Sequence, residues 1–211
     1  MPSNATNADI HYRTENHMKI VATEWMSLDG VVQSPSYPTE DPSGGFRHGG
    51  WHGRFFEGVS MQWVIDSVTG ADAYLLGRGT YDIFAAHWPN AGPEQAVLAD
   101  PLNARPKYVA SSRPLTPVWT NAHRLSGGLG ASIAELKSSA DGTLLLIGSP
   151  GLTQSLLHLD LIDELRIMID PIIVGSGKRL FGATDSPLPL EHTSSMTVPS
   201  GSILTTYTRS R

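Results

Sequence analysis

Two kinds of short apolar segment alternate along this chain of 211 residues, and the alternation restricts the possible folds more than any other feature. Some segments are runs of β-branched and other apolar residues, which are typical of buried strands. Others carry apolar residues three and four positions apart, which is typical of amphipathic helices. Strands that alternate with helices pair mainly in parallel, and the helices cover the faces of the sheet. The sequence therefore predicts an α/β domain.

The predicted strands and helices alternate until the last part of the chain, where two strands follow each other. Strands are predicted over 19–27, 73–76, 107–110, 122–125, 143–147 and 164–169. Helices are predicted over 60–68, 131–139 and 152–159. Two final strands, 188–197 and 203–208, flank the turn Pro199-Ser200-Gly201, so a closing antiparallel hairpin is expected.

Composition limits the class of protein. Residues 1–17 show no apolar periodicity and are predicted to be a leader or a natural extension, and residues 18–211 are predicted to form one domain. A formal net charge of -5 argues against a nucleic-acid or anionic-membrane partner. Cysteine is absent, and no apolar stretch has the length of a membrane span. We expect a soluble, cytoplasmic protein with a small-molecule substrate.

Three predicted strands are followed by residues suited to an anionic ligand. In open α/β sheets, ligands bind beyond the carboxyl ends of the strands, where main-chain N–H groups and helix N-termini favour anions. Thr80 is expected to cap the helix after the second strand, and Ser149 to cap the helix that starts at Pro150. Each cluster alone also fits an ordinary turn. The candidate residues are Gly77, Arg78 and Thr80; Ser111, Ser112 and Arg113; and Gly148, Ser149, Gly151 and Leu152.

A long segment, residues 33–58, is crowded with Gly, Pro and aromatic residues, and a loop of this length usually has a function. We predict that it is a lid over a substrate site. Asp29, at the end of the first strand, is either an acid that orients or protonates the substrate or a turn former. The aromatic candidates for a substrate wall, which could equally be core residues, are Trp25, Trp51, Phe55 and Phe56.

No metal site is predicted. His48 and His52 would face one ion only on a helix, which Gly49, Gly50 and Gly53 disfavour. The segment Gly175-Ser176-Gly177-Lys178 resembles a phosphate-binding loop but has Ile172 in place of the first required glycine. No serine-hydrolase motif is present.

Five motifs in register resemble the dihydrofolate-reductase-like superfamily, and in particular the C-terminal reductase domain of the bacterial bifunctional riboflavin deaminase-reductase. The resemblance implies a three-layer α/β/α fold with a mixed, mainly parallel sheet, an NADPH site across the strand ends, and a homodimer. The motifs are Met26-Ser-Leu-Asp-Gly30, Leu76-Gly-Arg-Gly-Thr-Tyr81, Ile147-Gly-Ser-Pro-Gly151, Leu161-Ile-Asp-Glu-Leu165 and Pro171-Ile-Ile-Val-Gly-Ser-Gly-Lys-Arg-Leu-Phe181.

The same resemblance assigns roles to the strand ends. It implies that Gly77, Arg78 and Thr80 lie beside the cofactor phosphates and that Ser111, Ser112 and Arg113 receive the 2′-phosphate. Gly148, Ser149 and Gly151, with Leu152 next to them, match the pyrophosphate turn. The arginines predict a preference for NADPH over NADH. The residues expected to bind substrate are Trp25, Asp29, Phe55, Glu57 and Gln62.

The reaction implied is hydride transfer to a small heterocyclic or sugar-imine or carbonyl substrate, as in the riboflavin-pathway reductase. Dihydrofolate reductases carry an acid early in the helix before the glycine-arginine strand, where this chain has Met61, and the nearest acids are Glu57 and Asp66. Folate is therefore disfavoured, although the sequence still allows a dihydrofolate reductase proper. It also allows a protein that binds NADPH without turnover, as a sensor or scaffold, and a pure interaction module.

Overall fold

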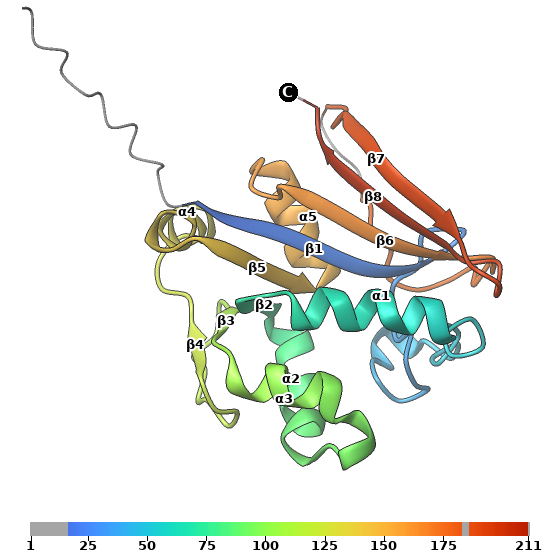
Figure 1. The fold of residues 1–211 in the computed structure, drawn as a ribbon, viewed down its shortest axis with the longest axis horizontal. Helices are drawn as coiled ribbons and strands as arrows, with labels where there is room; N and C mark the ends of the chain where they lie inside the picture. The colour runs from blue at the N-terminus through green and yellow to red at the C-terminus, as the bar shows by residue number, and fades with distance from the viewer. Residues whose placement is uncertain (1–16, 183–185, 211) are drawn as a thin grey trace, which may run out of the picture.

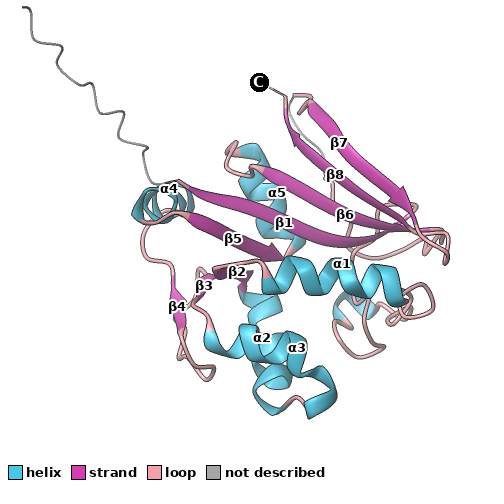
Figure 2. Ribbon diagram, in the orientation of Figure 1, coloured by secondary structure: helices cyan, strands magenta, loops and turns pink. Residues whose placement is uncertain are grey.

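The computed structural model describes residues 17–182 and 186–210, and in this part of the chain eight strands form one sheet. Their order is β4-β3-β2-β5-β1-β6-β8-β7. Helices cover both faces, with α1 across the front of the sheet and α5 behind it (Figures 1 and 2). This confirms the predicted three-layer fold. Residues 1–16, nearly all of the predicted leader, lie outside the described residues.

The strands agree with the sequence prediction to within a few residues. Strands β1 to β6 pair in parallel, whereas β8 is antiparallel to both β6 and β7 and closes the sheet as the expected hairpin. The bounds are β1 Met18–Ser27, β2 Ala73–Gly77, β3 Lys107–Ala110, β4 Ala122–Arg124, β5 Gly142–Ile147, β6 Glu164–Asp170, β7 Leu190–Thr197 and β8 Ile203–Arg209.

The helices include one that the sequence did not predict. Helix α3 contains Pro101, which normally ends a helix because proline lacks an N–H donor, yet burial of Ala99 and Leu102 holds the segment helical. The bounds are α1 Gly58–Thr69, α2 Arg78–His87, α3 Ala96–Ala104, α4 Leu129–Ser139 and α5 Pro150–His158, with short 3-10 turns at Ser43–Gly45, Trp88–Asn90 and Pro93–Gln95. No helix in the described ranges is long and apolar enough to cross a membrane.

The core lies on both faces of the sheet because successive residues of the central strands point to opposite sides. Leu144 and Leu146 of β5 pack with α4 and α5, while Leu145 between them packs against α1 and α3 on the other face. This burial on both sides explains why the central strands read as continuous apolar runs. It also fixes which side chains of β1 and β5 can reach the carboxyl edge of the sheet.

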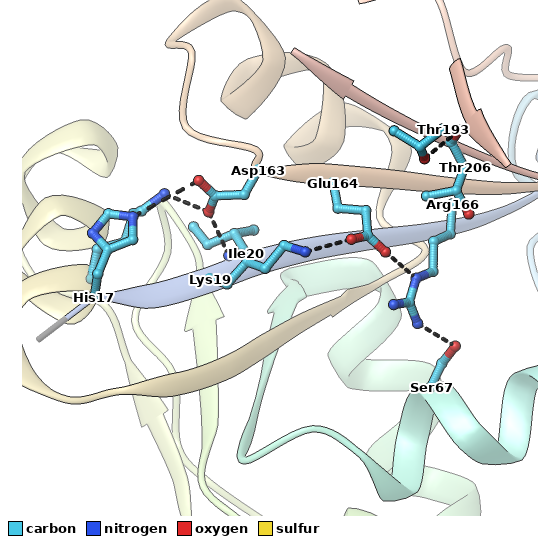
Figure 3. A network of polar contacts seen from close by, with 10 residues as sticks. His17, Lys19, Ile20, Ser67, Asp163, Glu164, Arg166, Thr193 and Thr206 are labelled. Atoms are coloured by element: carbon cyan, nitrogen blue, oxygen red, sulfur yellow. Dashed lines mark hydrogen bonds and ion pairs between the residues drawn. The ribbon is translucent and has the colours of Figure 1, made fainter. Parts of the chain in front are cut away.

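A chain of polar contacts fastens α1 to the sheet (Figure 3). Arg166 of β6 donates from Nη1 to Ser67 Oγ of α1 at 3.1 Å and from Nε to Glu164 at 2.6 Å. Glu164 also pairs with Lys19 of β1. Helix α1 is thereby held against β1 and β6, next to the edge of the sheet where the functional site lies.

Strand β7 is the edge of the sheet, and residues 191–197 are exposed. An exposed edge strand offers unpaired main-chain groups to a second chain. We expect a homodimer, as the family resemblance implies. Light scattering at micromolar protein should give twice the 22.7 kDa of one chain. A mass of one chain under these conditions would contradict the prediction.

Candidate functional site

A cavity of about 1000 Å³ opens at the carboxyl ends of β1, β2 and β5. The connection after β1 leads to β2 on one side of the sheet centre, and the connection after β5 leads to β6 on the other side. The cavity therefore lies where the direction of the connections reverses. Open α/β sheets bind their ligands at such positions. Its lining combines strand ends (Thr23, Glu24, Trp25, Gly77, Ile147) and helical residues (Val64, Ser67, Val68, Phe84) with two turns and the long loop after β1.

The turns after β2 and β5 are joined by one hydroxyl group. Ser149 Oγ accepts a hydrogen bond from the main-chain N–H of Gly77 at 2.8 Å and donates to Thr80 Oγ1 at 2.8 Å. Ser149 is nearly buried and has a left-handed backbone, with φ of 63°. In the sequence Thr80 and Ser149 follow separate strands, and the structure brings them into contact in the wall of the cavity.

Two details of the predicted caps were wrong. Helix α2 begins at Arg78 with Gly77 as its N-cap, so Thr80 lies inside the first turn and caps nothing. Ser149 does occupy the N-cap of α5 and Pro150 its first position, but the serine side chain makes no capping bond. Its oxygen is committed to Gly77 and Thr80 instead.

Glycines let the main chain of both turns approach the cavity closely. A Cβ at Gly77 would lie 3.1 Å from the Ser149 side chain, so a larger residue would push the two turns apart. At Gly79 and Gly151, by contrast, nothing lies within 4 Å of the Cβ position, and both residues line the cavity. The start of α5 thus presents bare main chain to the cavity at the positive end of the helix dipole.

The remaining predicted cluster, formed by Ser111, Ser112 and Arg113, lies beside the cavity and outside its lining. In the sheet Gly77 pairs with Ala110, so Arg78 and Ser111 leave neighbouring strand ends side by side. The Arg78 guanidinium is already engaged, with Asp82 at 2.8 Å and with the Pro114 carbonyl at 3.0 Å. Ser111 Oγ donates to the Arg113 carbonyl at 2.8 Å, and Ser112 and Arg113 are exposed. Arg78 therefore holds the 111–114 loop rather than facing the cavity.

The loop predicted as a lid forms the opposite wall of the cavity through residues 33–36 and 40–43, with Val32 directly before it. Gln33 is its fastening point: the side-chain amide donates to the carbonyls of Asp41 and Ser43 at 2.9 Å, and its oxygen accepts from the Lys178 N–H at 3.0 Å. Trp51 Nε1 donates to the Gln33 carbonyl at 2.8 Å. A single glutamine in a polar loop gave no signal in the sequence.

A buried polar cluster anchors the far end of the same loop. His52 Nδ1 lies 2.6 Å from Asp170 Oδ2, and Ser202 Oγ donates to Asp170 Oδ1 at 2.7 Å. Trp25, which lines the cavity, stacks on the His52 ring at 4.2 Å between centroids. His52 thus supports the aromatic wall. In the part of the chain that the structure describes, no three His, Asp or Glu side chains gather as a metal site.

A buried carboxyl group, which the sequence analysis did not single out, lies in the cavity wall. Glu24 of β1 is 4% exposed, and Thr153 Oγ1 of α5 donates to its Oε1 at 2.8 Å. Burial raises the pKa of Glu24 from 4.5 to about 8, and the bond from Thr153 opposes this only partly. Glu24 therefore carries a proton at neutral pH. A glutamate between Thr23 and Trp25 reads in sequence as a solvent-facing strand residue.

Three more ionisable groups line the cavity from loops. Burial raises the pKa of Glu40, although the main-chain N–H groups of Ser36 and Tyr37 lower it. Burial also acts to raise the pKa of Asp41, but the Lys178 ammonium at 2.7 Å and the Ser43 donors bring it below its usual value. With Glu24, the lining holds three carboxyl groups and one cation, and that cation is paired with Asp41.

Four of the residues predicted to touch substrate do not line the cavity. Phe55 is buried in the lid, and Glu57 is the N-cap of α1, where it forms a capping box with Ser60. Gln62 donates to Asp66 at 2.8 Å on the outer side of α1. Trp25 is the substrate-side residue that the structure does place in the wall.

Asp29, the predicted catalytic acid, is the fourth of these residues. Its carboxylate accepts hydrogen bonds from the Ser27 hydroxyl and from the main-chain N–H groups of Val174 and Gly175 at 2.7 to 3.0 Å. Burial acts to raise its pKa, but these donors hold the pKa at about 2. Asp29 thus joins two loops outside the cavity lining, and the catalytic role expected for it stays a prediction.

The sequence matches the family described as RibD C-terminal domain over residues 18–204. The chain belongs to this family. Two Bacillus subtilis (strain 168) relatives are the uncharacterized proteins YyaP, 26% identical over 165 residues, and YwjB, 26% identical over 126 residues. The first alignment covers 72% of this chain and 87% of YyaP, and the second covers 60% and 67%.

Solved structures show the same fold. A putative riboflavin biosynthesis protein from Shewanella sp. PV-4 superposes with a TM-score of 0.64 at 24% identity and covers 92% of this chain and 100% of its own. Dihydrofolate reductase from Enterococcus faecalis, complexed with NADP(H) and RAB-propyl, gives 0.58 at 14% identity, covering 92% and 97%. The RibD C-terminal domain assignment and these structures support a reductase-like family and confirm the resemblance seen in the sequence motifs.

The burial of Glu24 predicts how stability depends on pH. Between pH 4.5 and about 8 the folded chain keeps this proton while the unfolded chain loses it, so Glu24 makes the fold less stable as pH rises through this window. Glu24→Gln cannot ionise. We expect the free energy of unfolding of Glu24→Gln, relative to wild type, to be on the order of 4 kcal/mol higher above the window than below it.

Urea denaturation of both proteins at about pH 4.5 and pH 9 measures this difference. Glu135→Gln is the matched control, because Glu135 is exposed on α4 and its substitution should change stability equally at both pH values. If Glu24→Gln and wild type differ by the same amount at the two pH values, Glu24 is not protonated in the fold.

Proposed function

We propose that this protein is an NADPH-dependent reductase that transfers hydride to a small planar C=N or C=O compound. One observation carries the proposal: a single cavity joins the bare main chain at the start of α5 to a buried carboxyl group that holds a proton at neutral pH. The first feature suits a pyrophosphate, and the second suits a substrate that needs a proton when it accepts hydride.

The residues present fit the cofactor. The main-chain N–H of Gly151, on the first turn of α5, would receive the pyrophosphate, because the N–H groups of Leu152 and Thr153 already donate to the Ser149 carbonyl. The Ser149 hydroxyl holds Gly77 and Thr80 behind it. Ser111, Ser112 and Arg113, at the neighbouring strand end, would bind the 2′-phosphate. A volume of about 1000 Å³ is at the upper end for small-molecule sites, as a dinucleotide together with a substrate requires.

NADPH, when bound, supplies the hydride, and the work of the chain is to orient the substrate, exclude water and hold a proton. Trp25 offers a flat apolar wall that is supported from behind by His52. Val32 and the lid residues Pro35 and Pro42 close the opposite side against water. Glu24 is the proton-bearing group within the cavity.

Binding of NADPH without turnover is the competing function. The absence of an acid at the expected place on α1 favoured it: Met61 is 37% exposed and, like Asp66, does not line the cavity. The cavity nevertheless contains a buried acid, supplied by β1 instead of α1. This observation favours the reductase over the sensor or scaffold.

The cofactor assignment predicts a selective effect of Arg113. Because Arg78 is engaged with Asp82 and Pro114, the exposed Arg113 is the cation free to contact a 2′-phosphate. Arg113→Ala should weaken NADPH roughly 10- to 100-fold, the worth of one charge-assisted bond, and leave NADH unchanged. Isothermal titration calorimetry with both nucleotides measures the two affinities.

Arg209→Ala is the matched control, since it removes an arginine at the end of β8, where it pairs with Asp160 and does not line the cavity. It should change neither affinity. Equal affinity of the wild-type protein for NADPH and NADH, or an equal loss of both in Arg113→Ala, would contradict the assignment.

Dihydrofolate is expected to be a poor substrate. The wall formed by α1 consists of Val64, Ser67 and Val68 and offers no acid to a pterin ring, and Glu40 and Asp41 oppose the negative tail of folate. Steady-state oxidation of NADPH with dihydrofolate should give a kcat/KM below the ordinary enzyme range, which begins at about 10⁴ M⁻¹s⁻¹. A value inside that range would make the protein a dihydrofolate reductase.

A further inference from the structure

The Glu24 carboxyl group has one engaged oxygen and one free oxygen. Thr153 donates to Oε1 at 2.8 Å, and Thr153 Oγ1 also lies 3.3 Å from the Gly148 carbonyl oxygen, at the turn assigned to the pyrophosphate. Among the residues that the structure describes, none donates to Oε2. Glu24 as a whole is only 4% exposed, yet Oε2 does not belong to the fully buried side-chain atoms of the described residues that lack a hydrogen-bond partner. Some of the surface of Oε2 is therefore accessible. Oε2 is therefore the oxygen that a molecule in the cavity can reach.

Thr153 fixes the position of this carboxyl group. It is fully buried on the first turn of α5, and its main-chain N–H donates to the Ser149 carbonyl at 3.0 Å. The acid is thus set one helical turn from the junction of the two glycine turns. A bound molecule that reached both would have its phosphates at the turns and its reacting end near Glu24 and Trp25.

The charges of the lining select the kind of substrate. Glu24 is neutral at pH 7, Glu40 and Asp41 lie in the lid wall, and Lys178 is neutralised by Asp41 at 2.7 Å. Among the described residues of the lining no other cation is present, so a phosphorylated or carboxylated substrate would find no unpaired positive group beside the lid. The lining as a whole is mostly apolar, with Val32, Ile147 and Leu152 among its residues, and it suits a flat ring without negative charge.

We propose that Glu24 is the catalytic acid of this cavity and that the substrate is an uncharged planar cyclic imine, protonated on its nitrogen by Glu24. The proposal rests on the reductase function and adds to it the proton donor and the substrate class. It places the acid on β1, whereas dihydrofolate reductases carry theirs on the helix that corresponds to α1.

The atoms and electrons balance with NADPH as the reductant. The proton moves from Glu24 Oε2 to the imine nitrogen, which leaves a carboxylate beside an iminium ion and makes the adjacent carbon electron-poor. Hydride supplied by NADPH then converts this carbon to the amine carbon while the C=N π electrons become the nitrogen lone pair. Glu24 regains its proton from water after the product leaves.

The ionisable groups of the neighbouring elements are committed elsewhere. On β6, Glu164 and Arg166 pair with each other and Asp170 with His52. On α5, His158 is exposed and bonds the Gln154 carbonyl. The loops contribute the Glu40, Asp41 and Lys178 groups of the lid wall. A titration between pH 7 and 9 in the cavity is therefore assigned to Glu24, whose pKa burial raises to about 8.

The test uses 3,4-dihydroisoquinoline, a flat neutral imine whose protonated form absorbs at longer wavelength, added to the full chain without NADPH. At a pH where the free imine is neutral, the wild-type protein should show the iminium absorption of the bound probe. Glu24→Gln, which keeps the size of the side chain, should bind the probe and show only the neutral spectrum. Glu135→Gln on the surface of α4 should behave as wild type.

A second readout separates catalysis from structure. With NADPH added, Glu24→Gln should lower kcat on the neutral imine by about 10²- to 10⁴-fold, the usual contribution of a positioned acid. Its kcat on the N-methyl iminium salt of the same ring, which needs no proton, should be unchanged. Thr153→Val removes the bond that lowers the pKa of Glu24, so the loss of the iminium spectrum with rising pH should shift to higher pH.

Each outcome decides the proposal. An iminium spectrum that persists in Glu24→Gln, a wild-type protein that binds the probe only as the neutral imine or not at all, or equal losses on both ring compounds would overturn it. If NADPH binds by calorimetry while the imine does not, this inference fails and the cofactor-binding part of the proposed function stands. If NADPH itself does not bind, the proposed function fails. The spectral test contains no NADPH, so it still shows whether Glu24 protonates the bound imine.

Discussion

The hydrogen bonds of one serine hydroxyl hold the two glycine turns of the cavity wall in register. Ser149 reaches from the start of α5 to the Gly77 N–H and to Thr80, and the missing Cβ at Gly77 lets it come this close. Both turns follow parallel strands that are buried on each face, so the sheet fixes their positions and the serine fixes their spacing. The open main chain at Gly79 and Gly151 depends on this spacing.

The same sheet explains why a carboxyl group is tolerated in the interior. Glu24 lies on a strand covered by helices on both sides, and an ionised carboxylate there would cost several kcal/mol without a charged partner. Its one partner, Thr153, is neutral, so the group keeps its proton instead. Asp29, only five residues further along the chain, receives three donors and is ionised. Environment, rather than residue type, decides which of the two acids can give a proton.

The fold was predictable from sequence to a large extent because apolar periodicity records which faces are buried. Strands such as β3 were located to the residue, while α3 was missed because Pro101 and short side chains hide its pattern. At the site, the glycine turns could be predicted from the sequence because they need particular residue types. The hydrogen-bond and ion-pair partners of the site residues could not be predicted in this way. Arg78 was assigned to a phosphate, although Asp82 four residues later on the same helix was an available clue to its pairing. Glu24 carried no signal, since its burial depends on α5, far away in the chain.

The proposed function requires phosphates at the start of α5 and a reacting ring beside Glu24 and Trp25. The structure of the protein with NADPH bound, determined by crystallography, tests it most directly. We expect the pyrophosphate against the main-chain N–H of Gly151, the 2′-phosphate near Arg113, and the nicotinamide in the part of the cavity that Glu24 lines. A nicotinamide that lies away from Glu24, or a cofactor outside the cavity, would contradict the account.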